Sequence, residues 1–168
     1  IVNYETILTG FEFSKKFYPK IKVDREHSGF LVPIRPKYHE ILFPEAQKQQ
    51  TLFTYMEQAG NAIKQAYLCK SKTTQIKQGD LLFFYRSDDL KILTTIGIVE
   101  NAFRSDDFEQ ILTKVLKRTV YTLKELKDIS QTETLVILFR MHGHFNKYIS
   151  FNMLKSKNIL NGPLQSIK

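Results

Sequence analysis

The sequence has one cysteine and no tryptophan. Cys69 has no partner for a disulfide within the chain, which excludes a disulfide-stabilised scaffold and favours a reducing compartment. No stretch reaches the roughly 18 apolar residues that a membrane-spanning helix needs. The first ten residues lack the charged and then apolar layout of a signal peptide. We therefore expect a cytoplasmic protein with no membrane contact.

The chain also lacks internal repeats, low-complexity tracts and Gly/Ser-rich linkers. Its 168 residues are 42% apolar and 12% aromatic, which is typical of one globular domain and excludes wholesale disorder. The sequence starts at Ile1 and not at methionine. We expect residues 1–28 to be a connecting segment or the tail of an upstream domain, and residues 29–168 to form the domain itself.

Acidic residues are scarce at the end of the chain. The net charge is +8, and no Asp or Glu occurs from Thr134 to Lys168. This stretch carries five cationic residues interleaved with aromatic ones, namely Arg140, Lys147, Lys155, Lys157 and Lys168 among Phe139, Phe145, Tyr148 and Phe151. Such a pattern fits either a solvated basic face or contact with a polyanion, because cations that neutralise phosphates supply most sequence-independent nucleic-acid affinity.

Apolar patterning predicts six or seven short strands and two or three helices. The expected strands are 29–34, 66–69, 80–85, 92–100, 119–121, 134–139 and 147–151, the last two joined across His142-Gly143-His144. Residues 61–69 fit either a helix or a strand by their apolar spacing, and a strand is favoured at the Ala66 end. The expected helices begin at Pro44, at Ser105 or Asp106, and at Thr122. Residues 1–28 are expected to be irregular or edge-strand material, and 37–45 a compact aromatic turn. Strands without regular βαβ alternation indicate an α+β fold, built as a small mixed or antiparallel β-barrel with flanking helices.

Two stretches carry a family resemblance. Residues 76–87 (IKQGDLLFFYRS) and 96–100 (IGIVE) are similar to the core of PUA-like domains, the superfamily of the EVE, ASCH and YTH groups. The tryptophan cage of YTH readers is excluded here. More narrowly, residues 34–39, 42–45, 117–121 and 162–167 resemble bacterial proteins in which such a domain follows a GNAT acetyltransferase domain.

The resemblance implies a pseudobarrel that binds RNA or a modified base at its mouth, with nearby cations meeting phosphates. RNA is favoured over DNA as the partner, and no cofactor is expected. The candidate nucleic-acid-binding residues are Tyr85, Arg86, Ser87, Lys117, Arg118, Arg140, His142, His144, Lys147 and Tyr148. The alternative function is an accessory or regulatory protein-interaction domain of a GNAT-type acetyltransferase, with that upstream domain as its partner.

The sequence contains little that indicates catalysis. Residues 57–62 have the spacing of an acetyl-CoA pyrophosphate loop, but they begin with Glu57, whose carboxylate disfavours pyrophosphate. His142 and His144, with His39, have no Cys pair or carboxylate cluster to complete a metal site. We therefore expect no catalytic residue and no metal in this chain, and a non-catalytic binding module of a larger protein.

Overall fold

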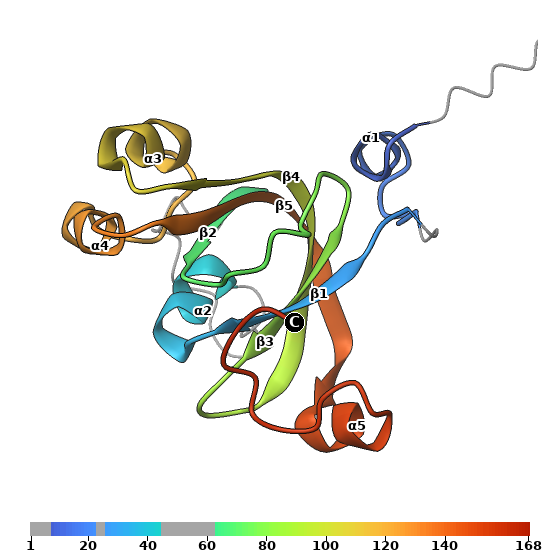
Figure 1. The fold of residues 1–168 in the computed structure, drawn as a ribbon. Helices are drawn as coiled ribbons and strands as arrows, with labels where there is room; N and C mark the ends of the chain where they lie inside the picture. Colours follow the sequence, from blue (N-terminus) through green and yellow to red (C-terminus); the bar gives the residue numbers. More distant parts are fainter. Residues whose placement is uncertain (1–7, 23–25, 45–62) are drawn as a thin grey trace, which may run out of the picture.

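The computed structural model describes residues 8–22, 26–44 and 63–168, and a five-stranded mixed sheet forms its centre (Figure 1). The strands are β1 (Gly29–Ile34), β2 (Lys64–Cys69), β3 (Leu81–Arg86), β4 (Ile92–Ser105) and β5 (Thr134–Ser150). Their order is β1-β3-β4-β5-β2, with β1 parallel to β3 and the other pairs antiparallel. The predicted α+β class and mixed sheet are confirmed. β1 and β2 are the two edges, and no strand pairing between them closes the barrel.

A buried carboxylate aligns the start of β1 with the start of β3. Asp80 is fully buried, and its side chain accepts hydrogen bonds of 2.8 Å from the backbone N–H groups of Ser28 and Lys77. Gly79 precedes it with φ of +91°, a conformation that glycine adopts without strain. The Gly-Asp pair therefore acts structurally here, by fixing the register of the parallel pair.

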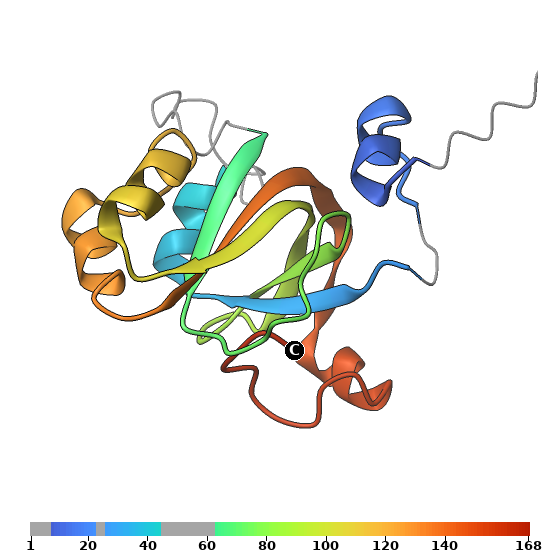
Figure 2. The same ribbon diagram turned by 45° about the horizontal axis from the view of Figure 1, so that its top comes forward.

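The predicted break between two C-terminal strands is wrong. β5 continues from Thr134 through Gly143 to Ser150, and Gly143 pairs with Ile96 of β4. β4 pairs with β5 on both sides of this glycine, from Thr134 to His144 and again at Ile149 and Ser150, so the glycine lies in a ladder and not in a turn. Register shifts in the β4–β5 pair, which are typical of β-bulges, accompany the curvature that both views show (Figures 1 and 2).

Two helices cover the outer face of β2 and β5. α3 (Phe108–Val115) confirms the predicted apolar spacing, but its N-cap is Asp107, whose carboxylate accepts hydrogen bonds from two N–H groups of the first turn. α4 (Leu123–Ile129) has the predicted capping box between Thr122 and Glu125. The strand expected at 119–121 is wrong, because this segment forms a turn in which Thr119 Oγ1 accepts from the N–H of Tyr121.

Three further helices were not expected. α1 (Gly10–Lys16) replaces the predicted irregular segment and starts at a capping box between Thr9 and Glu12. α2 (Pro36–Leu42) replaces the predicted aromatic turn, since Pro36 favours the first helical turn. α5 (Phe151–Ser156) follows β5 directly. The helix predicted from Pro44 lies mostly outside the described residues.

Aromatic rings fill the interior of the curved sheet. Phe43, Phe84 and Phe139 are completely buried, with ring centroids 4.8 Å apart for Phe43–Phe84 and for Phe84–Phe139. His39 lies beside them at 1% exposure, with its Nε2 2.7 Å from Thr94 Oγ1. Burial, with a smaller contribution from the nearby Arg86 and His144, lowers the pKa of His39 from 6.5 to about 4. The imidazole is therefore neutral at physiological pH.

The C-terminal segment lies along the free side of β1 (Figure 2). Lys168 and Leu31 exchange two backbone hydrogen bonds, of 2.8 Å from the Leu31 N–H and of 3.1 Å to the Leu31 carbonyl. Leu160 and Leu164 are buried in a small cluster against β1 and α5. No helix in the described part of the chain is long and apolar enough to span a membrane.

Candidate nucleic-acid-binding site

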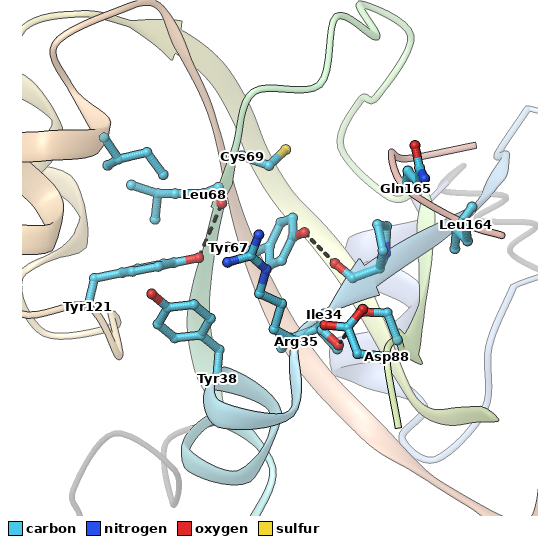
Figure 3. A pocket seen from close by; sticks show the side chains of 13 residues that line it. Ile34, Arg35, Tyr38, Tyr67, Leu68, Cys69, Asp88, Tyr121, Leu164 and Gln165 are labelled. Atoms are coloured by element: carbon cyan, nitrogen blue, oxygen red, sulfur yellow. Dashed lines mark hydrogen bonds between the residues drawn. The ribbon is translucent and has the colours of Figure 1, made fainter. Parts of the chain in front are cut away.

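A pocket of about 560 Å³ opens at the gap between the two sheet edges, β1 and β2 (Figure 3). Its walls come from the end of β1 with the start of α2, the second half of β2, the turn after β3, the segment before α4, the end of α4 and the C-terminal segment. The pocket thus joins parts of the chain that are distant in sequence. Because β1 and β2 do not pair, their side chains and ends remain available to line a cavity.

Two tyrosines hold the walls together. The Tyr67 hydroxyl donates a hydrogen bond across the gap to the carbonyl of Pro33 on β1. The Tyr121 hydroxyl donates to the carbonyl of Leu68 on β2, at 3.2 Å. Burial raises the pKa of both phenols above the ordinary value of 10, so both stay protonated and keep donating. The rings are therefore fixed in position within the wall.

A third tyrosine completes the aromatic wall. The rings of Tyr38 and Tyr121 lie 4.8 Å apart at 45°. The Tyr38 hydroxyl donates to the Glu125 carboxylate at 3.1 Å. Lys37 bonds the same carboxylate and, with the Thr122 cap, holds the pKa of Glu125 at about 2. All three tyrosine hydroxyls are thus engaged by the protein.

One cation and one carboxylate also line the pocket. Arg35 acts electrostatically on Tyr38, Tyr67 and Tyr121, which places its charge among the three rings (Figure 3). Asp88 lies in the turn after β3, with φ of +65°. Neither Arg35 nor Asp88 makes an ion pair within the described ranges. An aromatic cavity with one guanidinium and one carboxylate suits a planar ligand that carries both hydrogen-bond donors and acceptors.

Of the predicted succession Tyr85-Arg86-Ser87, only Ser87 lines this pocket. Tyr85 is 2% exposed and packs in the cluster that contains Leu164. Arg86 is largely buried, and its guanidinium bonds the carboxylates of Glu40 and Asp89. These carboxylates neutralise the charge of Arg86 locally, so it has a structural role in the β3–β4 turn.

The predicted pair Lys117 and Arg118 lines a different hollow, a groove of about 810 Å³ between α1 and α3. Arg118 Nη1 lies 2.8 Å from Glu100 Oε2, and Lys117 is exposed. The exposed Lys117 and the partly buried Arg118 therefore lie outside the tyrosine pocket, and their contact with nucleic acid stays a prediction.

The remaining predicted residues are spread along β5. His142 Nε2 lies 2.9 Å from the carbonyl of Pro19, and His144 Nδ1 lies 2.9 Å from Thr95 Oγ1. Arg140, Lys147 and Tyr148 line neither the tyrosine pocket nor the groove between α1 and α3. Across residues 8–22, 26–44 and 63–168, no three His, Cys, Asp or Glu side chains gather in a way that could hold a metal.

Sequence analysis missed Arg35, Tyr38, Tyr67 and Tyr121 as site residues. Three of them stand in segments that carry the family resemblance, 34–39 and 117–121, but nothing in the local pattern connects those segments. The residue types alone could have indicated a binding site, because Arg35 and Tyr38 closely follow the buried strand 29–34.

The fold is similar to crystal structures of the ASCH protein from Zymomonas mobilis. The unsubstituted protein aligns with a TM-score of 0.60 and 12% identity, covering 84% of this chain and 86% of that one. A tyrosine-to-phenylalanine variant aligns at 0.63 with 10% identity, covering 84% and 89%. No family model and no curated protein matches the sequence. The expectation from the ASCH-related resemblance is therefore confirmed at the level of the fold, which this chain shares with the Zymomonas mobilis ASCH protein.

Proposed function

We propose that this chain is a non-catalytic nucleic-acid-binding domain that holds one base, ordinary or modified, in the tyrosine pocket. The observation that carries the proposal is the cluster of Tyr38, Tyr67 and Tyr121 around the Arg35 guanidinium, in a cavity of about 560 Å³. That volume falls in the range of about 300–1,000 Å³ that is usual for small-ligand sites.

The wall chemistry supports a base as the ligand. Stacking of a base on an aromatic side chain contributes about 1–3 kcal/mol, and a guanidinium adds cation–π and hydrogen-bonding contacts. The Asp88 carboxylate disfavours a phosphate in this turn and suits the amino or imino donors of a base edge. A splayed-out base of single-stranded RNA fits such a pocket better than a base paired within a duplex.

The test measures binding of the four nucleoside monophosphates and of a single-stranded RNA of mixed sequence by isothermal titration calorimetry. We expect Arg35→Gln to weaken mononucleotide binding at least ten-fold. Arg35 is the N-cap residue of α2 but makes no side-chain capping bond, so the variant keeps the helix start. Arg140→Gln is the matched control, because Arg140 does not line the pocket. The affinity of this variant for mononucleotides should equal that of the wild type.

The alternative function, an accessory domain of an acetyltransferase, predicts a different result. Such a domain binds no oligonucleotide, or binds it with no dependence on salt, whereas a phosphate-contacting domain loses affinity as salt rises. Absent or salt-insensitive RNA binding by the wild-type chain would overturn the nucleic-acid proposal and leave the accessory function as the prediction to pursue.

A further inference from the structure

The groove between α1 and the C-terminal end of α3 has a mixed apolar and polar floor and a cationic rim. Phe11 of α1 and Leu138 of β5 contribute apolar surface, and Leu116 at the end of α3 is 60% exposed. Lys114 and Lys117 form the rim on the α3 side. With a volume of about 810 Å³, the groove is larger than the tyrosine pocket.

The positive charge of the groove is not cancelled by ion pairs within the described part of the chain. Lys114 and Lys117 make no ion pair with any residue in the described ranges. The carboxylate in the groove, Glu100, is bonded by Arg118 at 2.8 Å and is thereby neutralised. Two ammonium groups with no ion pair among the described residues remain beside the exposed Leu116 side chain, an arrangement that attracts a polyanion.

The groove and the tyrosine pocket are joined by the segment that follows α3. The Arg118 carbonyl accepts a hydrogen bond of 2.9 Å from the N–H of Ala66 on β2, and the Tyr121 hydroxyl donates to the Leu68 carbonyl. The segment therefore follows the free edge of β2, with its groove end at Ala66 and its pocket end at Leu68. Two residues of strand span about 7 Å, and this is about two stacked nucleotide steps of 3.4 Å each.

We propose that the groove binds the phosphates of the single strand whose base occupies the tyrosine pocket, with Lys114 and Lys117 contacting the phosphates that lie about two or more nucleotides from that base. This inference rests on the proposed function, and it adds a second binding site and a direction for the strand. The strand runs from the pocket along the β2 edge, over residues 118–121, into the groove.

The experiment compares ligand lengths. Fluorescence anisotropy measures binding of labelled single-stranded RNAs of two and of eight nucleotides, with the unlabelled mononucleotide followed by calorimetry. In the wild type we expect the longer RNA to bind at least ten-fold more tightly at low salt. In Lys114→Gln/Lys117→Gln this gain should fall to about two-fold, and the slope of log K against log salt should become less negative by about 1.4, since each phosphate contact on a single strand contributes about 0.7. Affinity for the mononucleotide should not change.

The matched control is Lys124→Gln/Lys127→Gln, which removes the same charge from α4, where both lysines are exposed and line neither hollow. It should keep the length gain. A gain that persists in Lys114→Gln/Lys117→Gln, or that the α4 control loses equally, overturns the groove assignment while mononucleotide binding still supports the pocket. If the wild type binds neither the mononucleotide nor the RNA, the proposed function fails and the groove assignment with it.

Discussion

Acidification should destabilise this fold before its carboxylates titrate, because of His39. Its imidazole is 1% exposed, and burial lowers its pKa from 6.5 to about 4. The unfolded chain takes up a proton near pH 6.5, whereas the folded chain does not until the pH is near 4. Proton binding therefore favours the unfolded state, so the contribution of His39 to stability is complete above about pH 6.5 and is lost as the pH falls toward 4.

The magnitude follows from the two pKa values. Each unit of difference corresponds to about 1.4 kcal/mol at full effect, so lowering the pH from about 7.5 to about 5 should cost about 2 kcal/mol of unfolding free energy. With a urea m-value of about 2 kcal/mol/M, the urea midpoint falls by about 1 M. That loss is a large fraction of the usual stability of about 5–15 kcal/mol for a domain.

Urea denaturation followed by circular dichroism, at several pH values between 7.5 and 5, tests the reasoning. His39→Gln keeps a polar group toward Thr94 but removes the titration, so its midpoint should change much less over the same interval. The difference between the wild-type and variant curves of urea midpoint against pH gives the contribution of His39 separately from that of the other histidines. Parallel curves for the wild type and the variant would refute the assignment.

Three further substitutions give separable outcomes. Tyr67→Phe removes the hydroxyl that bonds the Pro33 carbonyl across the sheet gap, and thermal denaturation should show a loss of about 1 kcal/mol together with weaker mononucleotide binding. Asp88→Asn keeps a residue that tolerates φ of +65° and should change which of the four mononucleotides binds best, with unchanged stability; an unchanged order would remove Asp88 from base recognition. Gly97→Ala places a methyl group 2.7 Å from Phe139 Cδ2 in the core, and chemical denaturation should show a loss of about 1–3 kcal/mol.

Local patterns predicted the elements whose signals are local. α3 has apolar side chains at helical spacing, and α4 starts at a Thr-x-x-Glu box, so both were found. The same box at Thr9 starts α1 and was overlooked. Gly143 suggested a turn because glycine is common in turns, but its pairing with Ile96 depends on a strand more than forty positions away. Such pairing is invisible in a window of ten residues.

The pocket was beyond local prediction for a similar reason. Arg35 and Tyr67 meet only because β1 and β2 are the two edges of a sheet whose order is β1-β3-β4-β5-β2. Of the predicted residues, Ser87 lines the pocket, since it follows the most evident strand. The acid-free C-terminal stretch, by contrast, indicated charge on β5, and most of those residues lie away from both hollows.

The contact between Leu31 and Lys168 gives access to the motion of the pocket. Leu164 and Gln165, which form one wall, belong to the same segment that these two backbone hydrogen bonds attach to β1. Detachment of the segment would free the Leu31 amide to exchange with solvent deuterium and would also widen the cavity. The hydrogen-exchange rate of the Leu31 amide, which is remote from any ligand contact, thus reports how often the pocket opens. A ligand held by that wall should lower this exchange rate in proportion to its occupancy.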